Sequence, residues 1–341
     1  MEVFIYHSCD EITSSKDPRD CIDCMKCNFI HLVNRPSQEQ LDVFYRDEFF
    51  QRAKPNYAKE EQEDIAWHRM LFADRLEDFT ELLGRKPESI LDIGCGTGLF
   101  LGWLSRQKGV RRCVGIEPNT QAWKLALHSG DVILTESLDT SCEPFDVVVL
   151  QFVLEHVLDP VAMIRQAMAY LKPDGILYVC CPNDFTEIQY RAAKAIGKPY
   201  YWVHVPDHIN YMNFDSLERL LLRCGLTPVL RDATFPMESF LLTDGFNYTE
   251  DSKLGRFLHT SRMDYELALD RADRNARRHL FRLLAMDGKG RDAIVFSKRE
   301  AERCQKCDDP LTAHPEVTAM GDIYRSVIIC DGRIIQTNEK V

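Results

Sequence analysis

The sequence lacks a long hydrophobic run. No apolar stretch approaches the roughly 20 residues that a membrane-spanning helix needs. The apolar start Met1–Ile5 gives way to polar residues too soon for a secretory signal peptide. We therefore expect a cytoplasmic protein without a membrane span.

Positive charge is also scarce. The 42 Lys and Arg residues stand against 53 Asp and Glu residues, which gives a net charge of −11 at pH 7. A nucleic-acid substrate needs a basic surface that neutralises phosphates, so this balance argues against nucleic acid as the partner, although a local basic patch stays open. Internal repeats and low-complexity segments are absent as well, and 341 residues suffice for one large domain or two ordinary ones.

Glycines do occur close together in one segment, Ile90–Leu99, which places three of them after a short apolar run. Ser89–Ile93 predicts a buried strand, and Leu99–Gln107 predicts the opening of a helix. Because glycine tolerates positive φ and carries no Cβ, the backbone here can approach a nucleotide-like ligand closely. The glycines are Gly94, Gly96 and Gly98. The loop therefore lies where an open α/β sheet binds ligands.

A second predicted strand, Arg112–Ile116, ends in the acidic residue Glu117. An acid about twenty residues beyond the first glycine can accept hydrogen bonds from both hydroxyls of a ribose. NAD and S-adenosylmethionine (SAM) both fit such a residue. Asp92 and the spacing of the glycines favour SAM, because the spacing differs from the Gly-x-Gly-x-x-Gly pattern of pyrophosphate-binding loops.

Taken together, the segments from about Ile90 to Pro182 resemble class I SAM-dependent methyltransferases in motif order and spacing. The segments are Ile90–Leu99, Glu117, Phe145–Val157 and Leu171–Asn183. The resemblance implies SAM as the cofactor, methyl transfer as the activity, and a Rossmann-like, doubly wound α/β fold.

The resemblance also implies which residues surround the cofactor. They belong to the glycine loop and to the ends of the neighbouring strands. The expected cofactor-binding residues are Asp92, Gly94, Cys95, Gly96, Gly98, Glu117, Pro118, Ser137, Leu138, Gln151 and Phe152.

Capping and breaking residues predict the remaining elements. Ser37 with Gln40 forms a capping box, and Pro is tolerated at the first helical position after Asp159. The expected helices run from Ser37 to about Arg46, Glu60 to Leu83 before Gly84, Pro160 to Leu171, and Ser216 to Cys224 with Asp215 as the cap. Further strands are expected near 132–134, 145–151, 175–181, 227–232 and 292–297. These elements predict a seven-stranded sheet with helices on both faces.

Three segments are expected in the chain. They are a Cys-rich segment with a helix over residues 1–50, a methyltransferase domain over 51–299, and a tail over 300–341 in which Asp331-Gly332 indicates a β-hairpin. The domain contains an insertion, Thr234–Arg291, with a helix from about Lys253 to Met286. Its arginines predict either a solvated helix packed on the edge of the domain or a basic wall that faces an acidic or phosphorylated substrate. They are Arg271, Arg274, Arg277, Arg278 and Arg282.

Thirteen cysteines in a chain without a secretory signal indicate free thiols and metal ligands rather than disulfides. Four of them lie within nineteen residues near the start, namely Cys9, Cys21, Cys24 and Cys27. Cys24 and Cys27 have the spacing of a zinc knuckle. A second Cys-x-x-Cys pair, Cys304 and Cys307, and the isolated Cys330 leave three alternatives open: they bind a second metal, join the N-terminal cluster or do neither.

The segment Cys24–Pro36, followed by Leu41–Phe50, resembles an N-terminal zinc ribbon found on one branch of these methyltransferases. The first Cys-x-x-Cys of that ribbon is missing here. The resemblance therefore implies one structural zinc on Cys24, Cys27 and Cys9, with His7 or Cys21 as the fourth ligand. A degenerate ribbon without metal is the alternative.

Two groups of residues are candidates for the base that an alcohol acceptor requires. One is Glu155 with His156, directly after the fourth strand, and the other lies in the run His204–Tyr211. Histidine suits this role because its pKa lies near the working pH. The catalytic candidates are His156, Glu155, His204, Asp207, His208 and Tyr211. Structural roles in a helix start and a turn are the alternative.

The segments Tyr200–Leu222 and Phe235–Leu242 resemble methyltransferases of bacterial surface-polysaccharide and deoxysugar pathways. This resemblance implies a sugar, a nucleotide-linked sugar or a related polar small molecule as the acceptor, methylated on oxygen or else on carbon or nitrogen. Two other functions stay open: a methyltransferase that acts on a macromolecule through the Cys-rich segment, and a catalytically silent SAM-binding scaffold.

Overall fold

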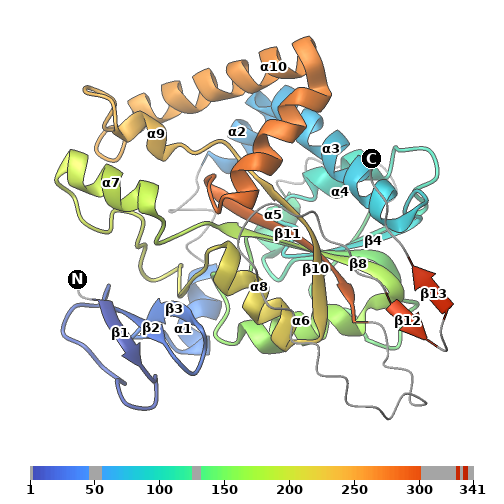
Figure 1. The fold of residues 1–341 in the computed structure, drawn as a ribbon, viewed down its shortest axis with the longest axis horizontal. Helices are drawn as coiled ribbons and strands as arrows, with labels where there is room; N and C mark the ends of the chain where they lie inside the picture. Colours follow the sequence, from blue (N-terminus) through green and yellow to red (C-terminus); the bar gives the residue numbers. More distant parts are fainter. Residues whose placement is uncertain (1–2, 46–55, 125–131, 301–327, 331–332, 337–341) are drawn as a thin grey trace. The chain divides into compact units, whose positions relative to one another are not determined.

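The computed structural model describes residues 3–45, 56–124, 132–300, 328–330 and 333–336. Met1–Arg299 forms one unit and Glu300–Val341 a second. The first unit is organised around a seven-stranded sheet (Figure 1). Its strands are β4 (Ser89–Ile93), β5 (Arg112–Ile116), β6 (Val132–Thr135), β7 (Phe145–Gln151), β8 (Leu171–Pro182), β10 (Leu226–Ala233) and β11 (Asp292–Arg299).

The order across this sheet is β10-β11-β8-β7-β4-β5-β6. The strands from β8 to β6 run parallel to one another, whereas β11 runs antiparallel between β8 and β10. This arrangement confirms the predicted Rossmann-like fold with seven strands. The chain begins the sheet at β4, adds β5 and β6 on one side, and then returns to place β7 on the other side.

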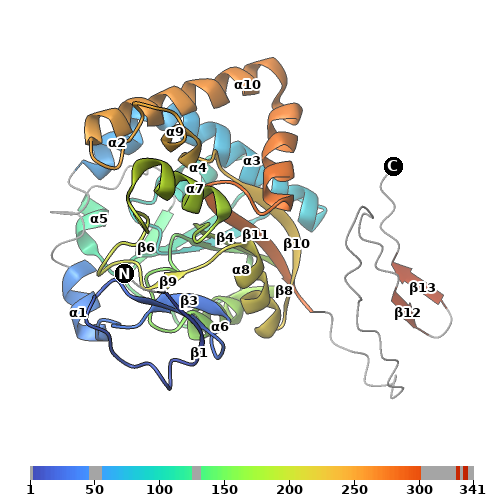
Figure 2. The same cartoon turned by 60° about the vertical axis from the view of Figure 1, so that its left-hand side comes forward.

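The strands are buried because helices cover both faces of the sheet. Val147 and Val149 of β7 pack with α3 (Ile65–Leu83) and α4 (Leu99–Leu104), while Val148 and Leu150 pack with α6 (Pro160–Ala169) and α8 (Phe214–Arg223). Figure 2 shows α3 and α6 on opposite sides of the sheet. Burial of both faces explains why β7 is a continuous apolar run. The other helices of this unit are α1 (Gln38–Val43), α2 (Tyr57–Glu63), α5 (Thr120–Lys124), α7 (Glu187–Ile196), α9 (Glu238–Leu241) and α10 (Ser252–Met286).

Two predicted helix boundaries are wrong. The helix expected over Glu60–Leu83 is two helices, because the buried Asp64 between them leaves the helical conformation and binds Arg256 of α10 (2.6 Å between Oδ1 and Nη2). The cap of α8 is Asn213 rather than Asp215, because the Asn213 Oδ1 accepts from the backbone N–H of Ser216 at 3.0 Å.

Other helix ends agree with the sequence. The Ser37–Gln40 capping box is present at α1, whose expected extension to Arg46 lies outside the described residues. The Asp159 side chain accepts from the backbone N–H of Ala162 at 2.9 Å, with Pro160 at the first helical position. The end of α3 at Gly84, where φ is +69°, matches the predicted stop.

Helix α10 packs against the domain, as one interpretation of the insertion expected, but most of its predicted arginines are ion-paired rather than solvated. Figure 1 shows it lying beside α3. Arg277 and Arg278 are buried and, together with Arg274 and Arg282, form ion pairs with acids of α3. These four arginines are therefore committed to ion pairs within the fold, with Arg274 and Arg282 partly exposed, and Arg271 alone of the predicted set is fully exposed.

A smaller sheet joins the N-terminal segment to the larger domain. Its strands are β1 (Val3–His7), β2 (Cys21–Cys24), β3 (Phe29–Leu32) and β9 (Asn210–Tyr211), in the order β1-β2-β3-β9. Strand β3 pairs antiparallel with β9, with Ile30 opposite Tyr211 and His31 opposite Asn210. The Cys-rich segment is therefore hydrogen-bonded to the run that carries the candidate catalytic histidines.

The second unit contains the predicted hairpin. Strands β12 (Ile328–Cys330) and β13 (Arg333–Gln336) pair antiparallel. Cys304 and Cys307 lie outside the described residues. Of the helices that the structure describes, none is both long and apolar enough to traverse a membrane.

Candidate functional site

The predicted cofactor residues gather at the carboxyl ends of four neighbouring strands. Asp92 lies near the end of β4, and the glycine loop follows that strand. Glu117 follows β5, Ser137 follows β6, and Gln151 ends β7. The strand order changes direction between β4 and β7, because β5 lies on one side of β4 and β7 on the other. Open α/β sheets bind ligands in the crevice at such a switch point.

The glycine loop is tight enough to exclude side chains. Gly94 has a φ of +78°, and a Cβ there would lie 2.7 Å from Cγ2 of Val153. Its backbone N–H donates to the carbonyl of Ile116 at 2.7 Å, which ties the loop to β5. Gly98, with a φ of +71°, is the N-terminal cap of α4. The loop thus keeps its backbone bare at the edge of the sheet, as close approach to a ligand requires.

Glu117 holds the loop from the neighbouring strand. Its Oε2 accepts from the backbone N–H of Gly96 at 3.0 Å, and its Oε1 accepts from that of Asn119 at 2.8 Å. Burial raises the pKa of Glu117, and these two donors oppose the rise. Each carboxylate oxygen has a second lone pair, so a ribose diol can still donate to Glu117.

Asp92 is a buried acid with no ion-pair partner in the part of the chain that the structure describes. Its side chain is 5% exposed, and its Oδ1 has no hydrogen-bond partner among the described residues. Burial and repulsion from Glu117 raise the pKa of Asp92 to about 8. Burying an unpaired carboxylate is costly. A positively charged ligand such as SAM would offset that cost, so the acids at this edge fit the cofactor.

The remaining predicted cofactor residues divide into two kinds. Cys95 packs under Gly115, whose added Cβ would lie 2.4 Å from the Cys95 Sγ, and the Leu138 side chain packs against the core. Both therefore have packing roles in this structure. Phe152 has a φ of +56° and is 43% exposed at the end of β7. Pro118 and Ser137 are also exposed, and Gln151 is partly exposed, so these four residues remain available at the edge.

The two groups of catalytic candidates form one cluster. Ligand atoms of His156, Asp207 and His208 all lie within 4.8 Å of one another. The Nδ1 of His156 lies 2.7 Å from the backbone carbonyl oxygen of Asp207, and the rings of His156 and His208 are 4.9 Å apart. The same three side chains could ligate a divalent metal, but a proton-transfer site uses the same arrangement.

The hydrogen bond to Asp207 sets the protonation of His156. A carbonyl oxygen can only accept, so Nδ1–H is the donor and the lone pair of the neutral ring lies on Nε2. This Nε2 is 3.9 Å from Oε1 of Glu155. Burial raises the pKa of Glu155 well above its usual value, which favours the protonated acid. The Nε2 lone pair of His156 is therefore the candidate acceptor for a substrate proton, whereas burial favours the protonated form of Glu155.

Tyr211 and His204 have different positions from His208. The Tyr211 hydroxyl donates to the backbone carbonyl of His208 at 2.9 Å, and its side chain is 2% exposed. Tyr211 thus holds the turn that presents His208. His204 is exposed, and its ring lies 5.5 Å from that of His208, at the outer side of the cluster.

Tyr45 is a site residue that the sequence analysis missed. Its hydroxyl donates to the backbone carbonyl of Asp207 at 3.5 Å, and its ring lies 5.7 Å from that of His156. The side chain of Asn119, two residues after Glu117, donates to the carbonyl of Tyr45. Tyr45 therefore connects the cofactor side of the site with the histidines. Its local sequence gives no signal for this role, because the contacts join residues distant in the chain.

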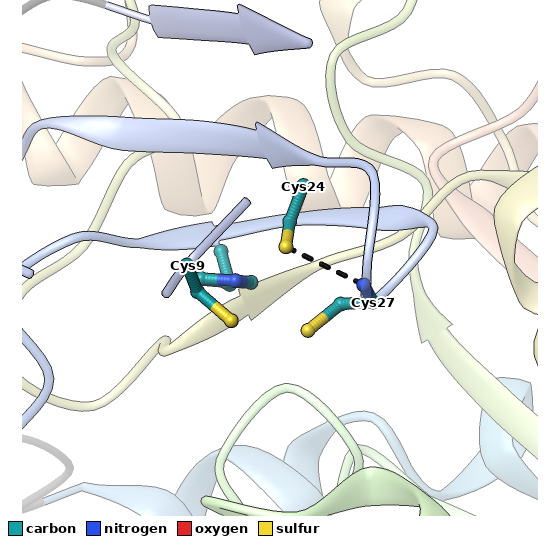
Figure 3. A group of neighbouring side chains, drawn as sticks. Cys9, Cys24 and Cys27 are labelled. Carbon is teal, nitrogen blue, oxygen red and sulfur yellow. Dashed lines mark hydrogen bonds between the residues drawn. The ribbon is translucent and has the colours of Figure 1, made fainter. Parts of the chain in front are cut away.

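A second cluster lies in the N-terminal segment, where Cys9, Cys24 and Cys27 point toward one another (Figure 3). With His31 they form a group whose ligand atoms lie within 4.8 Å of one another. The two residues predicted as alternatives for the fourth ligand lie apart from this group. Cys21 is buried on the other face of β2, where its thiol contacts the carbonyl of Arg19, and His7 is exposed beside Glu11.

The chemistry of this cluster suits zinc, because thiolates and imidazole are its usual ligands. The backbone N–H of Cys27 donates to the Sγ of Cys24 at 3.4 Å (Figure 3). Burial alone would raise the pKa of Cys24, but backbone donors from Cys27, Cys9 and Lys26 lower it overall. Burial lowers the pKa of His31 to about 4, so its ring is neutral at neutral pH.

Comparisons with known proteins identify a methyltransferase domain. Residues 66–230 match the model of the methyltransferase domain family. The ubiquinone biosynthesis O-methyltransferases of Haemophilus ducreyi and Actinobacillus pleuropneumoniae are 34% and 37% identical over 116 residues, which cover 30% of this chain and 47% of each relative. The chain thus spans about half the length of the curated relatives that it matches.

One similar solved structure is that of the plantazolicin methyltransferase BpumL in complex with a monoazolic desmethylPZN analog and SAH. It is 14% identical with a TM-score of 0.48, and the match covers 77% of this chain and 97% of that one.

Proposed function

We propose that this chain, which carries a class I SAM-dependent methyltransferase domain at residues 66–230, methylates a polar small molecule on oxygen. The observation that supports this most is the cluster of His156, Asp207 and His208, which lies just beyond the carboxyl end of β7. The glycine loop and Glu117 occupy the carboxyl ends of β4 and β5 at the same edge of the sheet. A base and a cofactor site are thereby neighbours.

The division of roles follows from the geometry. SAM supplies the activated methyl group when it is bound. Glu117 would accept hydrogen bonds from the ribose hydroxyls, and the bare backbone of the glycine loop would hold the cofactor at the carboxyl end of β4. His156 removes the proton of the acceptor hydroxyl through Nε2, while the Asp207 carbonyl keeps its Nδ1 protonated. Holding the acceptor oxygen in line with the methyl group supplies much of the rate.

Oxygen as the acceptor atom is supported by the names of the curated relatives, which are O-methyltransferases. A sugar or nucleotide-linked sugar is supported by the resemblance of Tyr200–Leu222 to enzymes of deoxysugar pathways. Polar side chains around His156, including Tyr45 and His208, suit an acceptor with several hydroxyls. The cytoplasmic location and the absence of a nucleic-acid partner remain predictions.

A structural zinc ion in the N-terminal segment belongs to the same proposal. Three of the predicted ligands, Cys9, Cys24 and Cys27, come together in the structure. An imidazole and three thiolates would close the coordination shell, which is typical of structural rather than catalytic zinc.

Binding and turnover test the proposal separately. We expect calorimetry to give a micromolar dissociation constant for SAM, worth roughly 7 to 9 kcal/mol. Removing a general base costs on the order of a hundredfold in rate. His156→Ala and His208→Ala should therefore lower the rate of SAH formation with a panel of nucleotide-linked sugars and a catechol by about that factor, while SAM affinity stays unchanged.

His279→Ala, at an exposed histidine on α10, is the matched control. If both site variants turn over at the rate of the wild type, the histidines are structural and the enzyme works without this base. If SAM releases no heat and NAD raises the melting temperature instead, the assignment of SAM as the cofactor is wrong.

A further inference from the structure

We propose that His31 is the fourth ligand of a Cys3His zinc site, and that the bound metal holds strand β3 against β9 and thereby positions His208. This inference rests on the structural zinc proposed above. It adds the fourth ligand of that zinc and the role of the zinc in the fold. The predicted ligand Cys21 has no part in it.

The strand register explains why His31 joins the cysteines. In the β2–β3 hairpin, Cys24 lies opposite Phe29 and Ile22 lies opposite His31. Side chains alternate between the two faces of a strand. Cys24, Ile22 and His31 therefore share one face, whereas Cys21 is on the other.

The spacing within the cluster suits a tetrahedral metal. Ligand atoms of Cys9, Cys24, Cys27 and His31 lie within 4.8 Å of one another. Ligands at about 2.3 Å from a tetrahedral zinc are separated by roughly 3.8 Å, so small side-chain shifts would complete the site. Apolar side chains of Ile22 and Val33 pack around the thiols.

His31 itself has the environment of a metal ligand. It is 1% exposed, and its Nδ1–H donates to the backbone carbonyl of Leu32 at 2.8 Å. Its Nε2 is buried with no hydrogen-bond partner among the described residues. Metal-binding histidines characteristically donate one ring N–H to a carbonyl and offer the other nitrogen to the metal. A buried, unpartnered Nε2 otherwise costs free energy.

His31 is also connected to the catalytic cluster through the pairing of β3 with β9. His31 lies opposite Asn210 in the β3–β9 ladder, and the backbone N–H of Leu32 donates to the carbonyl of Ile209 at 2.9 Å. The side chain of Asn210 donates to the carbonyls of Leu154 and Val157, at 2.8 and 2.7 Å, on either side of His156. A ladder with only two paired positions is weak by itself. A metal at His31 would hold it in register beside His208.

Metal content tests the ligand set. We would use the full chain with Cys304→Ser and Cys307→Ser, which removes the second Cys-x-x-Cys pair as a source of metal. Elemental analysis should find one zinc per chain. The Co²⁺-substituted protein should show thiolate charge-transfer bands and the absorption of a tetrahedral site.

His31→Ala should lower zinc affinity at least tenfold, and His31→Cys should restore it. Cys21→Ser, at a buried cysteine outside the group, is the matched control and should bind zinc like the parent. The ligand assignment is overturned if His31→Ala retains zinc with parental affinity, if Cys21→Ser loses it, or if the parent chain binds no zinc.

Hydrogen exchange tests the positioning role without relying on activity. Removing the metal should reduce the protection of the Leu32 amide, which donates to the Ile209 carbonyl, and of the Ile209 amide, which donates to the Glu155 carbonyl beside His156. SAM affinity kept within about twofold would be evidence of a folded domain. Once an acceptor is known, kcat should fall while KM for SAM stays. Unchanged protection of these amides after metal removal would show that the metal does not position β9, even if the methyltransferase activity is confirmed.

Discussion

The acids of helix α3 and the acids at the carboxyl edge of the sheet are buried to a similar degree but are compensated differently. Asp74 and Asp78 of α3 are 2% and 1% exposed, while Asp92 and Glu155 at the edge are 5% and 3% exposed. Asp78 binds Arg278 at 2.6 Å, Arg282 at 2.5 Å and Arg75 at 3.1 Å. Asp92 and Glu155 each have an oxygen without a partner among the described residues.

This difference separates a structural junction from a ligand site. Burying charge is tolerable when the countercharge belongs to the fold, as it does where α10 meets α3. At the edge of the sheet no described arginine or lysine forms an ion pair with Asp92 or Glu155, and burial outweighs the attraction between Arg291 and Glu155. Perturbed acids in a crevice are characteristic of functional sites. The comparison therefore indicates that ligand binding at the edge of the sheet is expected to offset the free-energy cost of burying these acids.

The largest effect is expected from breaking the ion pairs between the acids of α3 and their arginines. Asp78→Ala leaves Arg75, Arg278 and Arg282 without their shared carboxylate, and breaking a buried ion pair in this way costs about 3 to 5 kcal/mol. Urea unfolding should show a loss of that size. Glu187→Ala, which removes an exposed partner of Arg191, is the control and should change stability little. Equal effects of the two substitutions would contradict a structural role of the network.

The next test removes an acid from the carboxyl edge of the sheet. Glu117→Ala should weaken SAM binding by about 1 to 3 kcal/mol, because charge-assisted hydrogen bonds to the ribose are lost. Calorimetry measures this directly, with the exposed Glu143→Ala as the control. Glu117 has no part in cofactor binding if both variants bind SAM with the affinity of the wild type.

The last test uses pH to sharpen the comparison, and its effect per pH unit is the smallest. With a pKa of about 8 in the folded protein against 3.8 as the ordinary value, Asp92 holds a proton between these limits only when folded. The free energy of unfolding then decreases as pH rises through this window, by up to about 1.4 kcal/mol per pH unit. Asp92→Asn cannot titrate and should lose that part of the slope.

Urea unfolding from pH 5.5 to 8 without ligand, on the order of six points, measures this slope. Asp139→Asn is the control, because backbone hydrogen bonding lowers the pKa of Asp139 below this range. Parallel pH curves for Asp92→Asn and the wild type would show that Asp92 is ionised, or already paired, throughout the range.

The sequence predicted the central strands well because burial on both faces leaves a clear pattern. Ser89–Ile93, Arg112–Ile116 and Phe145–Gln151 have the boundaries expected of them. The start of α8 was displaced by two residues, because Asn213 and Asp215 are both good capping residues and only the hydrogen bonds distinguish them. Local patterns thus identify an element more reliably than its end.

Local sequence patterns could not predict residues whose role depends on contacts between segments that are distant in the chain. His31 follows no Cys-x-x-Cys spacing, and the register of the β2–β3 hairpin alone places it on the face of Cys24. The arginines of α10 looked solvent-exposed, because their partners Asp74 and Asp78 lie roughly 200 residues earlier in the chain. Tyr45 was missed for the same reason.

The β3–β9 pairing limits how this protein can be recombined with its relatives. A chimera that exchanges residues 1–36 alone would keep β9 but replace the strand that faces it, so His31 opposite Asn210 would be lost together with the Leu32–Ile209 hydrogen bond. A workable graft would transfer the N-terminal segment together with residues 204–213. Two stretches far apart in the chain therefore behave as a single exchangeable part, and we expect them to vary together when such enzymes are shuffled.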